Sequence, residues 1–128
     1  MSADLVSRAR AVMENAYAPY SRFHVGAAIE AEDGSVHVGC NVENASYGLT
    51  ICAERMAVGA AVAAGKRKFA RVVVASGVEP PATPCGACRQ LLAEFGLDLE
   101  VITAGPRSQR RWRLRDLLPE AFTPESLQ

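Results

Sequence analysis

Apolar residues recur along the chain with two different periods, and the change of period separates helices from strands. Near the N-terminus they fall at i, i+4, i+7, i+8 and i+11, which is one face of a helix. The residues in this stripe are Leu5, Ala9, Val12, Met13 and Ala16. The helix should end at Tyr17-Ala18-Pro19-Tyr20, because proline disfavours helical backbone in the residue before it.

Extended segments are predicted at residues 25–31, 35–42, 69–76 and 99–103, with a short one near Trp112. The first two flank Asp33-Gly34, a pair of residues that favours a tight hairpin turn. The third contains Val72-Val73-Val74, a continuous apolar run that is typical of a buried strand. The sequence therefore predicts a hairpin followed by further strands of one sheet.

Two further helices are predicted between these strands. Thr50 is a suitable N-cap for a helix that runs to Ala64, and Gly65 is a suitable stop. The next helix is predicted over residues 85–95, with Thr83 as its cap. Both helices therefore begin shortly after a strand or loop that ends in polar or proline residues.

The predicted order is helix, β-hairpin, helix, strand, helix, strand and a short tail with a helical turn at 115–118. Strands that alternate with helices indicate a sheet covered by helices and partly parallel. No internal repeat or low-complexity segment interrupts this order. The sequence therefore predicts one α/β domain over residues 1–128.

Charge and composition narrow the possible partners. The chain has 128 residues, with 14 basic and 14 acidic side chains, and this balance argues against a nucleic-acid partner. We interpret the arginines within 107–115 as a solvated face. No segment approaches the roughly 18 apolar residues of a membrane span, and the N-terminus lacks the apolar core of a signal peptide. We therefore expect a cytoplasmic protein, whose four cysteines stay reduced and serve a metal or catalysis.

Three cysteines, here called the cysteine triad, lie where two of the predicted helices begin: Cys52, Cys85 and Cys88. Cys85 and Cys88 are three residues apart and share a helix face, so both can bind one metal ion. The positive N-terminal end of a helix lowers the pKa of a thiol and favours the thiolate that zinc needs. Three protein ligands leave one position of tetrahedral zinc for a water, whose pKa falls to about 7.

Two charged residues follow Cys52 directly. Glu54 is suited to take a proton from such a water, and Arg55 to donate hydrogen bonds to the thiolates and offset their charge. Residues two apart on a helix face different ways, so Cys52 and Glu54 can address one ion only if the helix points its N-terminus at it. Cys52-Ala53-Glu54, followed by Pro84-Cys85-Gly86-Ala87-Cys88, matches the signature of zinc deaminases.

Other interpretations of these residues stay open. The Cys85–Cys88 pair can be a redox pair, although this leaves Cys52 without a role. Cys40 can be the fourth ligand of a closed structural site, although its strand pattern suits a small buried side chain. Glu54 and Arg55 can be ordinary surface charges of a helix.

Longer stretches carry a more specific likeness: residues 17–23, 25–28, 39–50 leading into the zinc motif, and 117–122. Together they resemble the small homotetrameric cytidine deaminases over nearly the whole chain. The resemblance implies a three-layer α/β/α fold with a mixed, mostly parallel sheet of about five strands. It also implies one Zn²⁺ per subunit. The family often has proline where His24 stands, a departure that affects the entry to a strand and not the chemistry.

The resemblance implies substrate contacts that spacing alone does not give. It identifies Asn41 and Glu43 with the pair that binds the ribose hydroxyls, and Phe23 with the aromatic residue that packs against the pyrimidine. The backbone of Ala53 should help to hold the base carbonyl. By pattern alone, Asn41 and Glu43 share one face of a strand end and suit a solvated edge equally well, and Phe23 suits the core.

The resemblance also implies contacts between subunits. In such enzymes Ala45, Tyr47 and the C-terminal Phe122 approach the site of a neighbouring subunit. By pattern alone, Tyr47 and Phe122 are ordinary packing residues. The expected assembly is therefore a homotetramer whose sites are shared between subunits.

These expectations combine into one predicted activity, the zinc-dependent hydrolysis of cytidine and deoxycytidine to uridine and deoxyuridine in pyrimidine salvage. A zinc-bound hydroxide attacks C4, and Glu54 moves protons as a general acid and base. Three alternatives are a deaminase of another aminopyrimidine nucleoside such as blasticidin S, a nucleic-acid editing deaminase, and a structural zinc module that binds a protein. The last of these predicts four protein ligands with Cys40 among them.

Overall fold

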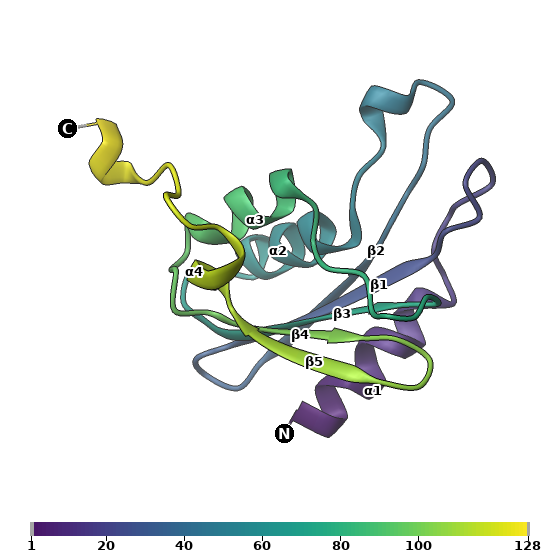
Figure 1. The fold of residues 1–128 in the computed structure, drawn as a ribbon, viewed down its shortest axis with the longest axis horizontal. Helices are drawn as coiled ribbons and strands as arrows, with labels where there is room; N and C mark the ends of the chain where they lie inside the picture. Colours follow the sequence, from purple (N-terminus) through teal and green to yellow (C-terminus); the bar gives the residue numbers. More distant parts are fainter. Residues whose placement is uncertain (1, 128) are drawn as a thin grey trace.

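A five-stranded mixed sheet in the order β2-β1-β3-β4-β5 forms the centre of the molecule (Figure 1). The structure is a computed structural model that describes residues 2–127. The strands are β1 (Val25–Ala31), β2 (Val36–Cys40), β3 (Phe69–Ser76), β4 (Glu100–Ala104) and β5 (Gln109–Arg113). The helices are α1 (Ser2–Met13), α2 (Ala53–Ala63), α3 (Gly86–Ala93) and α4 (Leu114–Leu117), with 3₁₀ turns η1 (Tyr47–Leu49) and η2 (Pro124–Leu127).

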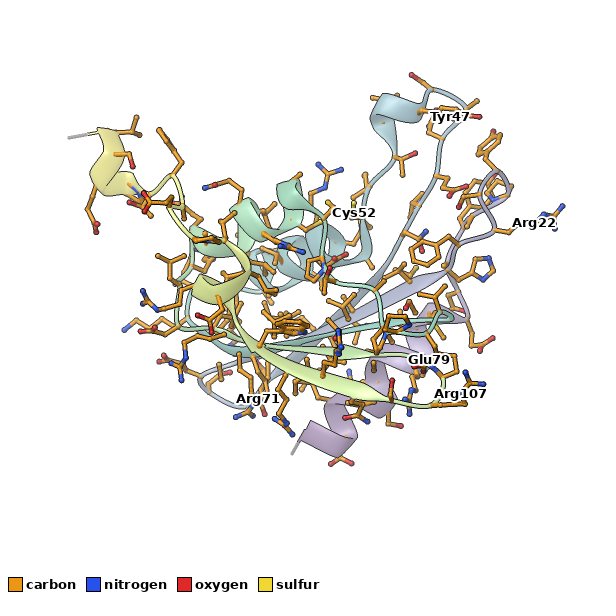
Figure 2. All side chains as sticks on the ribbon, in the orientation of Figure 1. Arg22, Tyr47, Cys52, Arg71, Glu79 and Arg107 are labelled. Carbon is orange, nitrogen blue, oxygen red and sulfur yellow. The ribbon has the colours of Figure 1, made fainter. Side chains whose placement is uncertain are left out.

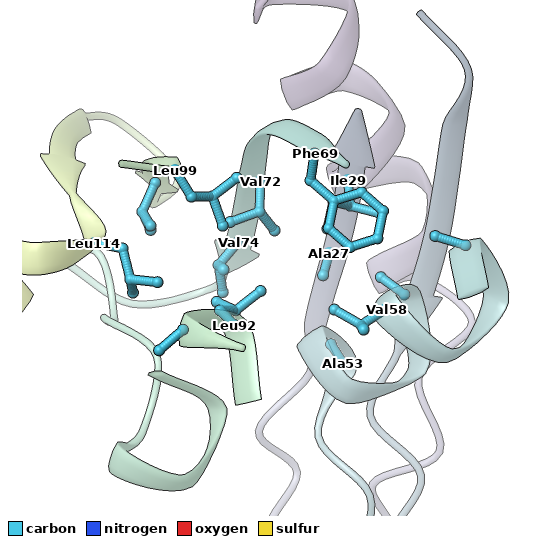
Figure 3. Close-up of a cluster of buried hydrophobic side chains, with 14 of the residues drawn as sticks. Ala27, Ile29, Ala53, Val58, Phe69, Val72, Val74, Leu92, Leu99 and Leu114 are labelled. Carbon is cyan, nitrogen blue, oxygen red and sulfur yellow. The ribbon is translucent and has the colours of Figure 1, made fainter. Parts of the chain in front are cut away.

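Helices cover both faces of the sheet, as the sequence predicted. Val72 and Val74 of β3 point to the face covered by α2 and α3, where they join the larger buried cluster (Figure 3). Val73 and Ala75 point to the opposite face and pack against α1. Because side chains alternate along a strand, the continuous valine run supplies both layers of the core.

The expectation of a mostly parallel sheet is wrong. Only β3 and β4 pair in parallel, through the crossover that contains α3, whereas β1–β2, β1–β3 and β4–β5 are antiparallel. Two of the antiparallel pairs are hairpins with short turns, which force their strands to run in opposite directions. The crossover through α2 sets β3 parallel to β2, but β1 lies between them.

Strand boundaries follow the sequence more closely than helix starts do. The segments 25–31 and 69–76 are strands as predicted. Helix α2 begins after Cys52, and the predicted N-cap at Thr50 is wrong. The Thr50 hydroxyl instead accepts a hydrogen bond from the backbone N–H of Asn44 at 3.3 Å, so it stabilises the preceding loop.

The other helix ends differ for similar reasons. Cys85, and not Thr83, is the N-cap of α3, because the Thr83 hydroxyl accepts a hydrogen bond from Arg89 at 3.0 Å. Helix α1 ends at Met13, one turn before Ala16, although Ala16 continues the apolar stripe. At the start of α3 a side-chain hydrogen bond, and at the end of α1 a turn, overrides the helix boundary that the local sequence predicts.

Two glycines let helices lie directly on the sheet. A Cβ at Gly39 of β2 would come within 2.5 Å of the backbone nitrogen of Ala57 and 2.8 Å of the Ala53 carbonyl oxygen in α2. A Cβ at Gly26 of β1 would lie 2.1 Å from the carbonyl oxygen of Ala9 in α1. Atoms cannot approach so closely, so these positions require glycine and fix the distance between each helix and the sheet.

The loop between β2 and α2, with η1 at its tip, projects from the sheet and its helices (Figure 1). The C-terminal tail, residues 119–127, projects as well. Their side chains include Tyr47 and Phe122, which are 73% and 59% exposed. Among residues 2–127, no helix has both the length and the apolar character needed to cross a bilayer.

Candidate active site

The cysteine triad comes together where the N-termini of α2 and α3 meet. The sulfur atoms of Cys52, Cys85 and Cys88 all lie within 4.8 Å of one another. Zinc–sulfur bonds of about 2.3 Å in a tetrahedral site place ligand sulfurs about 3.8 Å apart, so the triad fits one zinc ion after a small contraction. Cys40 does not belong to this group in the described part of the chain. The closed four-sulfur site that the sequence left open is therefore not formed.

Helix starts position the sulfurs. Cys52 and Cys85 are the N-caps of α2 and α3, both with extended backbone and neither with a side-chain capping hydrogen bond. Cys88 lies in the first turn of α3 and is buried. Glu54 lies in the first turn of α2, and both Cys52 and Glu54 line the same cavity. The N-terminus of α2 thus points into the site, which is the condition that the spacing of these two residues required.

Glu54 is a buried carboxyl group, 5% exposed, and not a surface charge. Burial raises its pKa, and hydrogen bonds from its own backbone N–H and from Cys88, together with the charge of Arg55, oppose this only in part. A carboxyl group with a raised pKa exchanges protons more readily near neutral pH than an exposed one. Glu54 is therefore suited to proton transfer inside the cavity.

The thiol groups do not all behave as the helix N-termini predicted. Burial raises the pKa of Cys88, and the nearby charges of Glu54 and Cys52 raise it further. Burial also raises the pKa of Cys52. At Cys85 burial acts in the same direction, but hydrogen bonds from Cys88, Cys52 and the backbone N–H of Ala87 outweigh it and lower the pKa. The expected lowering holds for one cysteine of the triad, because burial, with the nearby charge of Glu54, disfavours the thiolate at the other two.

Arg55 follows Glu54 in the first turn of α2 and is only partly bonded. One terminal nitrogen of its guanidinium donates to the backbone carbonyl of Thr50 at 2.9 Å. Its Nε is buried, and no acceptor reaches it among residues 2–127. Buried donors without a partner are rare in proteins, which makes this N–H an unusual feature of the start of α2.

A cavity of about 240 Å³ opens beside the triad. Its lining residues are Phe23, Val25, Asn41, Glu43, Thr50, Cys52, Ala53, Glu54, Val74, Ala82, Thr83 and Cys85. The cavity is smaller than most drug-binding pockets and has a few polar groups among apolar walls, which suits one small ligand. It contains Phe23, Asn41, Glu43 and Ala53, the residues for which the resemblance implied substrate contacts.

Asn41 and Glu43 hold the loop that carries Phe23. The Asn41 amide nitrogen donates to the Phe23 carbonyl at 2.8 Å, and its oxygen accepts from the N–H of Val25 at 2.9 Å. The Glu43 carboxylate accepts from the N–H groups of Tyr20 and Ser21 and from the Ser21 hydroxyl. The Ser21 hydroxyl is the main reason that the pKa of Glu43 lies below its usual value. Both residues therefore already shape this side of the cavity without a ligand.

The remaining predicted contacts lie elsewhere. Ala45, Tyr47 and Phe122 are exposed and do not line the cavity of their own chain. Figure 2 shows Tyr47 at the tip of the projecting loop, away from Cys52. Its ring meets that of Tyr20 edge-on, with centroids 6.0 Å apart. The structure does not bring these residues together with the triad.

The sequence did not identify the wall formed by the loop between β3 and α3. Ala82 and Thr83 of this loop line the cavity. At the far end of the loop, the Glu79 carboxylate accepts from the N–H groups of Arg107 and Ser108 at 2.6 and 3.1 Å, and from the Ser108 hydroxyl (Figure 2). The only sequence signal for this wall is that the loop directly precedes Cys85, and the sequence pattern favours Thr83 as a helix cap.

Comparisons with known proteins agree with this site. A family model of the cytidine and deoxycytidylate deaminase zinc-binding region matches residues 2–104. The cytidine deaminase of Sporosarcina psychrophila is 44% identical over 125 residues, which is 96% of this chain and 92% of that protein. The cytidine deaminase of Mycobacterium tuberculosis H37Rv is 47% identical over 112 residues, covering 88% of this chain and 82% of that protein.

A solved structure is similarly close. The crystal structure of cytidine deaminase from Burkholderia pseudomallei superposes with a TM-score of 0.92 at 49% identity, covering 95% of this chain and 99% of that one. The matched region contains the cysteine triad, which can hold the zinc that the family model specifies. The chain is therefore an enzyme that belongs to the cytidine deaminase family.

Proposed function

We propose that this enzyme hydrolyses free cytidine and deoxycytidine to uridine and deoxyuridine, with zinc held by Cys52, Cys85 and Cys88. The observation that carries the proposal is the convergence of three sulfur atoms within 4.8 Å beside the buried carboxyl group of Glu54. When bound, zinc supplies a polarised water at the position that the three thiolates leave free.

Glu54 carries the protons of the reaction. It takes one from the attacking water and delivers it to N3 of the base, which makes C4 more electrophilic. After the oxygen has bonded to C4, Glu54 moves a second proton from that oxygen to the amino group. The C4–N bond then breaks, ammonia leaves and C4 keeps the oxygen as a carbonyl. Burial of Glu54 supports this role, because it keeps bulk water from competing for these protons.

Arg55 balances the charge of the triad in this proposal. Three thiolates donate more charge to zinc than imidazoles do and weaken the acidification of its water. The Arg55 Nε–H, buried and without an acceptor among the described residues, can donate to a thiolate once the site is filled. In this proposal Arg55 acts on the ligands and not on the substrate.

Substrate recognition falls to the other wall of the cavity. Phe23 packs on the pyrimidine ring, and the backbone at Ala53 holds the base carbonyl. Asn41 and Glu43 bind the ribose hydroxyls with the hydrogen-bonding capacity that the 20–25 loop leaves free. Each has more than one acceptor or donor site, so it can serve the loop and a hydroxyl together.

We further propose a homotetramer in which Ala45, Tyr47 and Phe122 complete the site of a neighbouring subunit. Tyr47 and Phe122 are large apolar side chains on projecting segments, exposed by 73% and 59%, which a second copy would cover. All four cysteines are free thiols, which supports a reducing, cytoplasmic setting.

The deciding experiment follows the absorbance of cytidine, deoxycytidine, blasticidin S and a cytosine-containing oligonucleotide in separate assays, with and without a zinc chelator. We expect turnover of both nucleosides, its loss with the chelator and its return with added zinc. A higher kcat/KM on blasticidin S, or on a cytosine-containing oligonucleotide, would replace the proposed substrate. Activity that persists after complete zinc removal would contradict the proposed mechanism.

A further inference from the structure

We propose that Arg89 is a positioning residue for this active site, which fixes the segment Thr83–Cys85 and through it a cavity wall and a zinc ligand. The inference rests on the proposed function, because it concerns the same cavity and metal. Arg89 lies on α3, directly after Cys88, and does not line the cavity. It therefore acts through its neighbours.

The guanidinium of Arg89 joins three parts of the chain. Its Nε donates to the Pro84 carbonyl at 2.7 Å, one terminal nitrogen donates to the Leu117 carbonyl at 2.7 Å, and the other to the Thr83 hydroxyl at 3.0 Å. Thr83 lines the cavity, and Pro84 precedes Cys85. The guanidinium of Arg89 thus fixes the two residues that come immediately before Cys85, a predicted metal ligand.

This segment needs such support because of the residue that caps α3. An N-cap serine or aspartate holds the first turn with its side-chain oxygen, but Cys85 makes no such bond and is exposed. Its sulfur is instead directed at the triad. A helical side chain points back toward the N-terminus, so Arg89 reaches the residues ahead of the cap and replaces the missing constraint.

The third bond connects the site to the end of the chain. Leu117 is the last residue of α4, and the C-terminal tail leaves from there. The next residue of α3, Gln90, donates from its side-chain nitrogen to the carbonyl of Phe122 in that tail. Adjacent side chains of one helix therefore hold the cavity wall and the start of the tail that carries Phe122.

The shape of the guanidinium, and not its charge, should matter. All three acceptors of Arg89 are neutral oxygens, two of them in the segment Thr83–Cys85 and one at the end of α4. A planar fork of donors can satisfy them together, whereas the ammonium of lysine is a point charge that cannot span them. A purely electrostatic role would survive replacement by lysine, and a positioning role would not.

The test compares Arg89→Met and Arg89→Lys with a matched control, Arg67→Met. Arg67 also donates to backbone carbonyls, those of Val62 and Lys66, but at the far end of α2 from Cys52. Three kinds of data are collected for each protein: kcat and KM on cytidine at full zinc loading, the rate of zinc release to a chelator, and hydrogen exchange of the backbone N–H groups within residues 82–86, all but that of Pro84, in the metal-free protein.

We expect a fall in kcat of roughly 10- to 100-fold for Arg89→Met, because small misplacements of reacting groups have effects of that size. Zinc release and exchange at 82–86 should accelerate about 10-fold or more, and Arg89→Lys should resemble Arg89→Met more than the wild type. Arg67→Met should leave all three unchanged. If Arg89→Met does not fold, Arg89→Lys carries the test alone, with the same directions expected.

Wild-type kcat and zinc release in a folded Arg89→Met protein would overturn the proposal, even with a lower melting temperature. Full rescue by lysine would also overturn it and assign Arg89 a charge role. If the wild type does not deaminate cytidine, the proposed function fails. Zinc release and exchange still decide the role of Arg89 in that case, since neither depends on the substrate.

Discussion

The two helix N-termini that form the site are built alike but held differently. Both are capped by a cysteine of the triad that makes no side-chain capping bond. In both helices an arginine of the first turns reaches back to a backbone carbonyl ahead of the cap, Arg55 in α2 and Arg89 in α3. The proposed zinc ligation by these two capping residues would explain this shared design, because a cysteine turned toward a metal cannot also cap its helix.

The difference lies in what fixes each helix to the rest of the molecule. Helix α2 rests on β2 through direct backbone contact at Gly39, and it carries the buried Glu54. The start of α3 is exposed at Cys85 and follows a loop that is held by side-chain hydrogen bonds. The buried carboxyl group of Glu54 therefore lies on the side of the site that direct backbone contact fixes, and Cys85 and Cys88 lie on the side that side-chain hydrogen bonds hold.

The largest effect should come from removing a ligand. We expect Cys88→Ala to lose zinc and with it nearly all activity, since two thiolates do not retain the ion. The matched control is Cys40→Ala, a change to a cysteine outside the triad, which should keep one zinc per chain. Metal analysis and the cytidine assay measure both. Stoichiometric zinc in Cys88→Ala would reassign the ligand set.

Glu54→Gln should separate the chemistry from the metal. We expect a loss of kcat of roughly 10³-fold, within the range for a general acid and base, because the amide cannot accept the proton of the attacking water. Zinc content and circular dichroism should match the wild type, since Glu54 is not a ligand. An unchanged kcat would remove Glu54 from the mechanism.

Gly39→Ala tests whether backbone contact fixes α2. The added methyl group would lie 2.5 Å from the Ala57 nitrogen, so α2 has to shift, and we expect about 1–3 kcal/mol less stability and lower activity. Gly59→Ala in the same helix meets no atom within 4 Å and should gain about 0.5–1 kcal/mol. Denaturant unfolding of both metal-free proteins measures this contrast. Equal stabilities would show that the helix is free to adjust.

The smallest effect concerns the loop that precedes α3. Hydrogen bonds from the Ser108 hydroxyl and the Arg107 N–H hold the pKa of Glu79 below its ordinary value of 4.5. A carboxylate whose pKa is lowered in the folded state stabilises the protein fully when the pH is above the ordinary pKa. This stabilisation is lost as the pH falls through the folded-state pKa. Glu79→Gln should therefore be less stable at pH 7 and approach the wild type in acid.

Unfolding between pH 7 and pH 3 checks this expectation. Glu14→Gln, at an exposed residue in the turn directly after α1, serves as the control and should have the same stability as the wild type at each pH. A stability difference between Glu79→Gln and the wild type that does not narrow in acid would mean that the carboxylate charge is not what organises the loop.

The sequence predicted much of the fold from local pattern alone. Two strands have the predicted bounds, and the run Val72-Val73-Val74 lies at the centre of the sheet. The signature around the triad predicted the metal site because its spacing is fixed by helix geometry. Local patterns succeed where the determining contacts lie within a few residues of one another.

Contacts between distant segments could not be predicted in this way. Strand direction depends on connections and packing, and most of the pairs are antiparallel. The Arg89–Leu117 and Glu79–Arg107 bonds each join residues 28 positions apart in sequence, so nothing in the local pattern marks them. The thiol pKa values depend on burial and on the charges of all members of the site together, which single helix ends do not reveal.

Because Gly39 and Gly26 have no side chain, α2 and α1 lie in direct backbone contact with the sheet at these positions. The absence of a Cβ there sets the distance between the helices and the sheet. Where side chains act as spacers, each change of size moves a helix, but here hydrogen atoms face the helix backbone directly. Aliphatic core side chains farther along the sheet can then be exchanged for others of equal volume without changing the width of the cavity. The same architecture therefore makes the core tolerant of substitutions and the two glycine positions intolerant of them.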